Sequence, residues 1–315
     1  MPTQNKLSDL FDFARNAPGD KPLFNQNGDV RAVIPGSPSV RGTIDLNSDE
    51  LPKIQAADGT LKRPPNGRPA VENLRIDAAI VRQSLVAQAG AEIIIYKDPT
   101  EAVSTGVLGD VVMMSKQAYF ETFEAAPFAL VADGSEVAAT PLPIKRAAIH
   151  LDAAGGPQTN TAIYGLRFEF SRATLKGYPS IEDSIMHAIA QGLARTTDAV
   201  LTGAIIAANP AAFSLADAAA AGVRMRELRA LVGTAGHGAA IDNNGVLRAA
   251  GIAAELTPDM AATIVGSFAR SAVMIRSDVD VIVDRTNIDG SLAVTAWAAL
   301  QPLLPDTTRF WTVQA

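Results

Sequence analysis

The sequence predicts an α+β protein organised around one long helix, and three observations lead to this prediction. A helix pattern runs from Ser180 to Gly203, and segments with strand patterns precede it. A segment rich in alanine and glycine follows the helix, and strand patterns return near the end of the chain. This order of parts is typical of a structural protein, because no catalytic motif stands at its centre.

Composition sets the first limits. The 315 residues suffice for one large domain or two smaller ones, and 48% of them are apolar while only 5% are aromatic. The net charge of −6 argues against a grip on nucleic acid along the whole chain, because such a grip needs a basic surface that neutralises phosphates. A local, non-specific contact with DNA stays compatible with this charge.

Several chemical classes are excluded or disfavoured by what the sequence lacks. The chain has no cysteine, which excludes disulfides, thiolate metal sites and a cysteine nucleophile. Its three histidines are too few and too scattered to predict a metal site: His150, His187 and His237. We therefore expect no metal, no cofactor and no catalytic residue. No apolar run of about 20 residues and no signal peptide is visible, so we expect a soluble protein made in the cytoplasm, with no membrane partner.

The N-terminal region, residues 1–75, has its own character. The spacing of Leu7, Leu10, Phe11 and Ala14 predicts one short amphipathic helix. Many prolines follow, so the region cannot form one long helix or a core of its own. It also carries apolar residues that a disordered tail should lack, and these favour an extended arm lying on another surface: Val30, Val33, Ile34, Val40, Ile44 and Leu46.

The next part of the chain is expected to begin with a helix over residues 71–90 that ends at Gly90. Strands are expected at Ala91–Tyr96 and Val107–Met114, followed by a long hairpin region over 118–172. This region contains the turn signal Asp133-Gly134-Ser135, a strand at Ala147–Leu151 and the alternating segment Thr161–Phe170. A hairpin of this length does not fit wholly inside a compact domain, and we expect it to reach a neighbouring molecule.

Side chains of this hairpin region are candidates for contacts between subunits. Three aromatic residues either join the core of the chain or anchor it to a neighbour, and the sequence leaves both readings open: Phe120, Phe123 and Phe128. Asp133 and Glu136 are expected at the tip.

The long helix is expected to begin after a Ser180 cap, with Glu182 and Asp183 in its first turn, where the helix dipole favours acidic residues. Its length of about 22 residues corresponds to about 33 Å. An apolar stripe at helical spacing predicts the face that packs on the core: Ile181, Ile185, Ile189 and Leu193.

The alanine-rich segment beyond this helix is expected to contain a helix over Leu215–Val232 and another opened by Thr257. The first would carry the cluster of Arg224, Arg226 and Arg229, which is either a solvated face or a contact with an acidic neighbour or nucleic acid. The glycine cluster Gly233–Gly238, with His237, lacks the lysine and hydroxyl residue of a phosphate-binding loop. Later strands are expected over Ser271–Val283 and Ser291–Trp297. In the first of these, Asp278 and Asp280 flank Val279 and either hold a cation or form the solvated face of the strand, which the alternation favours.

Taken together, these parts resemble the major capsid protein of tailed bacteriophages with the Hong Kong 97 fold. The segments that carry the resemblance are Phe128–Glu136 and Ile163–Thr174, Ser180–Gly203, Val265–Arg276 and Val279–Arg285. They look like the two sides and exit of an extended loop, a spine helix, and the close of an axial domain. The resemblance covers about residues 115–315. Ser267 stands where the family often has aspartate, and the start of this chain is longer and richer in proline than a usual arm.

The resemblance implies a division of the chain into the parts of that fold. The expected parts are an N-terminal arm (1–75), a first peripheral part (76–117), an extended loop (118–172), a spine helix (173–203), an axial domain (204–283) and a return to the peripheral domain (284–315). In the axial domain, the resemblance implies contacts between subunits through Arg224, Arg226, Arg229 and His237.

The function implied is a major capsid protein that self-assembles as hexamers and pentamers into an icosahedral shell around double-stranded DNA. Scaffolding and portal proteins are implied partners, with a decoration protein as a further one, and the expected location is the virion capsid after assembly in the host cytoplasm. Family members that cross-link use an asparagine on the late strand. Leu292–Leu300 contains none, so we expect a non-covalent shell.

Two alternatives remain open at this point. One is the shell of an encapsulin-like compartment, which has the same fold. The other is an α/β metabolic enzyme that uses the Gly233–Gly238 loop, although the chain lacks a regular alternation of strands and helices.

Overall fold

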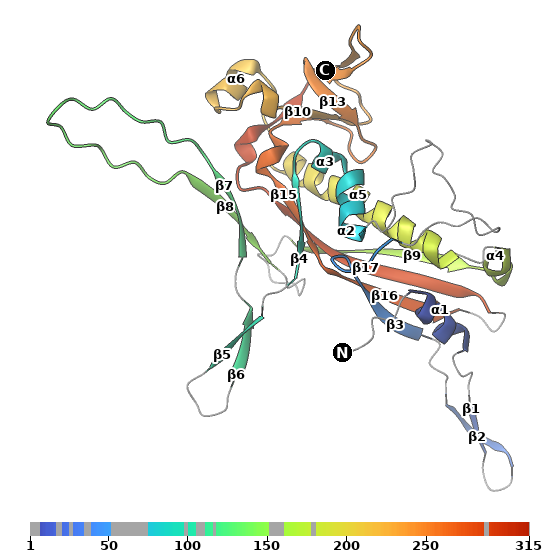
Figure 1. Cartoon of the computed structure of the whole chain (residues 1–315). Coiled ribbons are helices and arrows are strands. Elements are labelled where there is room, and N and C mark those ends of the chain that lie inside the picture. Colours follow the sequence, from blue (N-terminus) through green and yellow to red (C-terminus); the bar gives the residue numbers. More distant parts are fainter. Residues whose placement is uncertain are drawn as a thin grey trace.

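The computed structural model of the chain has the predicted α+β architecture (Figure 1). A central sheet carries a long helix on one face, a second sheet lies at one end, and a long hairpin leaves the body. The structure describes residues 7–16, 21–24, 28–34, 39–51, 75–97, 100–104, 111–115, 118–150, 161–177, 181–286 and 290–314. The predicted Ser180 cap and the strand residues 107–110 lie outside these ranges.

The central sheet is built mainly from the last third of the chain. Its strand order is β3-β16-β17-β15-β4, with β9 also paired to β17. Because β16 and β9 both pair with the first half of β17, they must lie on opposite sides of it. The strand bounds are β3 Ser39–Asp45, β4 Glu92–Tyr96, β9 Ala162–Phe170, β15 Ala272–Arg276, β16 Asp278–Arg285 and β17 Leu292–Leu303.

The long helix, α5, spans Ile181–Ala207 and covers one face of this sheet (Figure 1). Its 27 residues correspond to about 40 Å. The predicted stripe is confirmed, since Ile181, Ile185, Ile189 and Leu193 are all buried in the main core. Alternate residues of the sheet face the same core, among them Val279, Val281 and Val283 of β16 and Leu292, Val294 and Leu300 of β17.

The N-terminal region joins this core. Helix α1 spans Leu7–Asn16, and its predicted apolar residues Leu7, Leu10, Phe11 and Ala14 are all buried. It packs near β3, β16 and α5, and Arg15 Nη2 donates a 3.2 Å hydrogen bond to Glu182 of α5. Strand β3 adds an edge to the sheet beside β16. At these residues the region therefore packs on the body of its own chain. Its role as the N-terminal arm of a shell subunit stays a prediction.

The helix predicted over 71–90 is interrupted. Helices α2 (Ile76–Gln83) and α3 (Leu85–Gln88) meet at Ser84, whose backbone is extended. Ser84 caps α3, and its side chain also donates a hydrogen bond of 2.6 Å to Asp198 of α5. The break has a physical cause: a serine side chain satisfies the free amides of a new helix better than it continues an old one.

Strands β7 (Ala118–Phe123) and β8 (Ile144–Ile149) pair at the base of the long hairpin. Ile149 packs with Ala272, Met274 and Leu303 in a small core separate from that of α5. The prediction that Ile163–Thr174 forms one side of this hairpin is wrong. Those residues form β9, which pairs with β17 in the central sheet, and helix α4 (Arg172–Gly177). The alternation of β9 suits a strand with one face on the core, and β17 offers it a full-length partner.

The second sheet has the strand order β11-β12-β13-β10-β14-β18. Its bounds are β10 Arg229–Val232, β11 Ala239–Ile241, β12 Leu247–Ala249, β13 Ile252–Leu256, β14 Thr263–Gly266 and β18 Phe310–Val313. Its own core includes Leu228, Val232, Val265 and Trp311. The segment 272–283, predicted with the axial domain, lies instead in the central sheet, and β18, predicted to return to the peripheral domain, closes the second sheet.

Two predicted helices of this region are wrong. The helix expected over Leu215–Val232 stops after α6 (Leu215–Ala220), because Gly222 adopts a φ of +68° and ends it. A short 3-10 turn, η1 (Met225–Glu227), and strand β10 follow. No helix begins at Thr257, whose backbone amide instead donates to Val232 of β10.

Smaller elements complete the described chain. Two more hairpins stand away from the sheets, β1 (Lys21–Phe24) with β2 (Val30–Ile34) and β5 (Thr100–Ser104) with β6 (Val111–Ser115) (Figure 1). Short 3-10 turns η2 (Phe268–Arg270) and η3 (Thr307–Arg309) join strands of the late chain. In the part of the chain that the structure describes, no helix is both long and apolar enough to cross a membrane.

Candidate assembly surfaces

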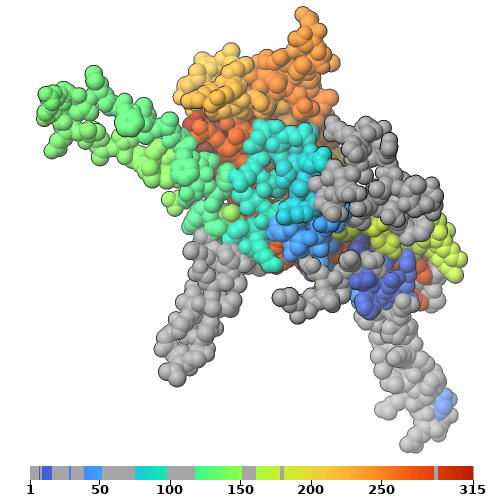
Figure 2. Space-filling model, in the orientation of Figure 1, coloured from blue at the N-terminus to red at the C-terminus, as the bar shows by residue number. Residues whose placement is uncertain are grey.

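The projecting hairpin is the first candidate surface. The β7–β8 ladder ends at Phe123 and Ile144. Residues 124–143 continue outward without regular secondary structure and project from the body (Figure 2). The tip is the predicted turn: Gly134 has a φ of +79°, and Ser135 N donates a 3.0 Å hydrogen bond to Ala132 O. A long segment with so little internal bonding has no core of its own.

The apolar side chains of this segment are open to solvent. Phe128 and Leu130 are fully exposed, and Phe123, Val137 and Leu142 are 66–78% exposed. Predicted tip residues Asp133 and Glu136 are exposed as well. Single exposed apolar residues are ordinary, but a run of them along one projecting segment marks a surface that another molecule covers.

The three candidate aromatics therefore separate into two roles. Phe120 lies partly buried beside the small core of Ile149, Met274 and Leu303, within its own chain. Phe123 and Phe128 make no such core and face solvent. Phe120 therefore fits the core reading that the sequence left open, whereas a contact of Phe123 and Phe128 with a neighbouring molecule stays a prediction.

A cluster of charges lies where the hairpin leaves the body. Arg309 of η3 donates from Nη2 to Glu124 at 2.6 Å and from Nε to Asp306 at 3.0 Å, and Lys145 of β8 donates to Asp306 at 2.7 Å. Asp306 is buried, which by itself would raise its pKa; the hydrogen bonds from Lys145, Thr308 and Arg309 outweigh this and hold that pKa far below its usual range. Arg309 likewise lowers the pKa of Glu124.

The second sheet carries another candidate surface. Leu215, Met225, Ile241 and Leu256 are 59–72% exposed, although each belongs to an ordered element or its border. The predicted arginines are exposed too, but they do not share a helix face: Arg224 precedes η1, Arg226 lies within it, and Arg229 begins β10. Arg229 Nη1 donates to the carbonyls of Arg226 and Leu228.

The glycine loop at 233–238 does not form a phosphate cradle. Its amides are already bound: Gly233 N donates to Ala262 O, Thr234 N to Met260 O and Ala235 N to Ala261 O, at 2.9–3.1 Å. A phosphate-binding loop needs such amides free and convergent. Gly233 is required for another reason, since a Cβ there would lie 2.5 Å from two backbone oxygens. His237 is exposed at the end of the loop.

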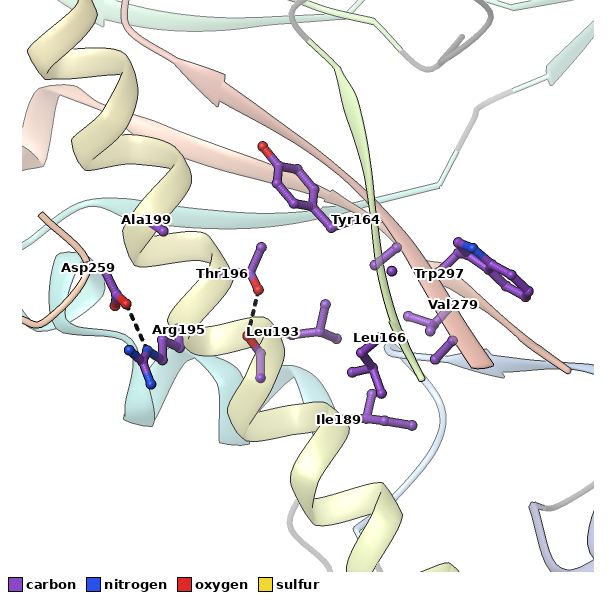
Figure 3. A pocket seen from close by; sticks show the side chains of 14 residues that line it. Tyr164, Leu166, Ile189, Leu193, Arg195, Thr196, Ala199, Asp259, Val279 and Trp297 are labelled. Atoms are coloured by element: carbon purple, nitrogen blue, oxygen red, sulfur yellow. Dashed lines mark hydrogen bonds and ion pairs between the residues drawn. The ribbon is translucent and has the colours of Figure 1, made fainter. Parts of the chain in front are cut away.

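A shallow cavity of about 430 Å³ lies between α5 and strands β9 and β17 (Figure 3). Its walls are mostly apolar or small, including Leu166, Leu193 and Ala199. The charged residues lining it, Arg195 and Asp259, bond to each other at 2.8 Å and so tie α5 to the loop before β14. Among the described residues, no group of three or more histidine, aspartate or glutamate side chains is placed to hold a metal ion.

A buried aspartate forms the tightest polar contact within the core. Asp198, in the middle of α5, accepts hydrogen bonds from Ser84 Oγ at 2.6 Å and from the amides of Leu85 and Val86 at 3.0 Å. Burial raises the pKa of Asp198, while these hydrogen bonds oppose that rise. The carboxylate therefore acts as a cap for α3 supplied by another helix.

Sequence reasoning missed Asp198 and the cluster of Glu124, Lys145, Asp306 and Arg309. Their partners lie more than 100 residues apart in most cases, so no local pattern marks them. It also missed Leu130, Val137 and Leu142. A usable signal exists for these three, because they flank the Asp133-Gly134 turn inside a segment that was already expected to project.

Comparison with known proteins gives likenesses of fold only. No family model and no curated protein matches the chain. Among solved structures, the capsid of an empty GTA particle is 14% identical, with a TM-score of 0.45 over 80% of this chain and 94% of the other. Structures of Mycobacterium phage Che8 and Gordonia phage Cozz are 11% and 14% identical, each with a TM-score of 0.43. They cover 71% and 74% of this chain, and 95% and 86% of theirs. Likenesses of this size do not assign a function.

Proposed function

We propose that this chain is the major capsid protein of a tailed bacteriophage or prophage, assembling into an icosahedral shell that encloses double-stranded DNA. One observation carries the proposal. A rigid core of helix and sheet supports a hairpin whose exposed apolar residues, led by Phe128 and Leu130, have no partner among the described residues of their own chain. Such an arrangement suits a heterologous contact, in which the hairpin of one copy is covered by the body of the next.

The other surfaces take roles in the same proposal. The exposed apolar residues and arginines around the second sheet would meet their copies around the five-fold and six-fold centres, as an axial domain does. The sheet with α5 would form the plate, and the N-terminal region would be the arm. Many modest contacts of this kind add up through closed symmetry to a stable shell.

Partners and location follow as further parts of the proposal. Scaffolding and portal proteins would take part in assembly, a decoration protein would bind the finished shell, and packaged DNA would be touched without sequence preference. The net charge of −6 suits a shell protein that binds the enclosed DNA only weakly. Assembly would take place in the host cytoplasm, and the mature location would be the virion capsid.

The alternatives have less support. An encapsulin-like compartment predicts a shorter N-terminal region than the one present here, which extends over about 75 residues. The metabolic enzyme required the loop at 233–238 as a phosphate site, and the amides of that loop are taken by Met260, Ala261 and Ala262.

The test is particle formation. The purified chain, alone and co-expressed with the products of neighbouring genes, would be studied by size-exclusion chromatography and negative-stain microscopy. We expect closed or tubular particles, and we expect the double variant Phe128→Ser, Leu130→Ser to form none. The matched control is Val81→Ser on α2, which removes a side chain that is 42% exposed but lies away from the hairpin. A small monomer or dimer under every condition would contradict the proposal.

A further inference from the structure

The charge cluster at the hairpin root joins three parts of the molecule: the hairpin, the central sheet and the second sheet. The hairpin ladder ends at the pair of Phe123 and Ile144; Glu124 lies just beyond this pair and Lys145 just inside it. Asp306 and Arg309 lie on the connection between β17 of the central sheet and β18 of the second sheet. The cluster therefore touches the hairpin, the end of the central sheet and the start of the last strand of the second sheet.

The cluster is built rather than accidental. The carboxylate of Asp306 accepts four hydrogen bonds: Oδ1 from the amide and hydroxyl of Thr308, and Oδ2 from Lys145 and Arg309. The side chains of Asp306 and Arg309 are only 4% and 9% exposed. Arg309 is held through Nε and Nη2, while its buried Nη1 has no hydrogen-bond partner among the described residues. Buried charges held by several hydrogen bonds keep a fixed geometry, whereas isolated surface ion pairs do not.

Backbone bonds fasten the same point to the second sheet. Ser267 N donates to Arg309 O at 3.1 Å, and Gly266 lies so close to Phe310 that no Cβ would fit between them. Arg270 Nη1 also donates to Phe123 O, from the hairpin side, at 3.4 Å. Thus a rotation of the hairpin about its root would have to break charged hydrogen bonds to a connection that is itself held in place.

We propose that Glu124, Lys145, Asp306 and Arg309 form a latch that sets the direction of the projecting hairpin and couples it to the second sheet. The latch concerns positioning, not the stability of the main core. Its consequence for shell curvature rests on the proposed function, but the latch itself is a property of the single chain. It can therefore be tested without any particle.

The absence of cysteine makes the test direct. Two cysteines, Ser135→Cys at the hairpin tip and Ala220→Cys at the end of α6, carry spin labels without competing thiols. Double electron–electron resonance spectroscopy then gives the distribution of distances between the spin label at the hairpin tip and the one beside the second sheet. Hydrogen exchange of the β7 and β8 amides reports the same movement independently.

The informative variants differ in burial. Arg309→Met removes the buried centre of the latch, and Lys145→Met removes its 40% exposed edge, which the fold is expected to tolerate. Lys145→Arg keeps the positive charge that Lys145→Met removes. The matched control is Arg146→Met, a neighbour on the same strand that pairs with Glu121 and lies over Tyr119 instead.

We expect a broader or shifted tip distance in Arg309→Met and Lys145→Met, with exchange in β7 and β8 about tenfold to hundredfold faster, since charged hydrogen bonds are lost. Arg146→Met should match the unmodified protein, and Lys145→Arg should lie close to it. If Lys145→Met is folded and its distances and exchange equal those of Arg146→Met, the latch is wrong. That outcome would not bear on the proposed function. Conversely, a chain that forms no particles but shows the expected shifts in Lys145→Met would contradict the proposed function and support the latch.

Discussion

The core around α5 and the projecting hairpin use similar side chains for different purposes. Ile189 on α5 is 2% exposed, while Phe128 on the hairpin is fully exposed. The first belongs to the main core that α5 and the central sheet share, and the second belongs to none of the cores formed by the described residues. Burial within the chain stabilises the fold, so of these two groups only the core residues contribute to the stability of the single chain.

The two regions differ in burial, and this shows that different sequence patterns specify folding and association. Apolar residues at helical spacing specify a core because a second element of the same chain covers them. Apolar residues beside an Asp-Gly turn, on a segment without strand pairing, stay exposed in the single chain, which is typical of a surface that binds another molecule. Substitutions can separate the two functions, and their expected effect on the free energy of unfolding falls from the core to the projecting hairpin.

The largest effect is expected in the core. Ile189→Ala should lower the free energy of unfolding by about 2–5 kcal/mol, because it removes buried methyl and methylene groups and leaves a cavity beneath the helix. Denaturant-induced unfolding measures the loss. Gln191→Ala, an exposed position on the same helix, should change it by no more than about 0.5 kcal/mol. Equal effects at both positions would show that α5 does not pack on the sheet through the predicted stripe.

A middle effect is expected at the polar contact between helices. Asp198→Ala should lower the free energy of unfolding by about 1–3 kcal/mol, because Ser84 Oγ, the partly buried amide of Leu85 and the buried amide of Val86 lose their acceptor. Ser84 would still cap α3, since it accepts from Ala87 N, so loss of the whole helix is not expected.

The same aspartate has a pH signature. Because the pKa of Asp198 in the folded state is raised, the folded state holds this proton more tightly, and its contribution to stability falls as pH rises from the unfolded value through the folded one. The charge of Asp259, which is itself paired with Arg195 at 2.8 Å, also raises the pKa of Asp198. The stability of Asp198→Asn should therefore improve relative to the unmodified protein as pH rises through that window. Parallel pH profiles in denaturant unfolding would contradict the raised pKa.

The sequence predicted the α5 core well because its signals are local. Four apolar residues at helical spacing were enough to identify the buried face. The end of the helix was less certain: Gly203 looked like its stop, but the helix continues to Ala207 and ends where Asn209 adopts a φ of +50° before Pro210. A glycine with open space around it weakens a helix without ending it.

Strand partners were beyond local reasoning. The alternation in Ile163–Phe170 correctly indicated a strand, yet nothing in those residues specifies whether it pairs with the hairpin or with β17. The helix expected through Leu215–Val232 failed because alanine-rich helical propensity yields to the turn at Gly222 and to the pairing of β10 with its neighbours. Among the candidate contacts, Phe128, Asp133 and Glu136 are exposed, and their contact with a neighbouring molecule stays a prediction, whereas Phe120 packs inside the chain.

The smallest effect on the free energy of unfolding is expected on the projecting segment before the hairpin tip, and it gives the sharpest contrast with the core. Phe128→Ser with Leu130→Ser should change the free energy of unfolding by no more than about 0.5 kcal/mol in the unassembled chain, because neither side chain is buried there. Phe120→Ser, in the same hairpin but packed beside Met274 and Leu303, should cost about 1–3 kcal/mol. Denaturant unfolding of both, below the concentration of self-association, separates them. If the tip variant were as destabilised as Phe120→Ser, the tip would have to fold back onto its own chain, and it would then be unavailable to a neighbour.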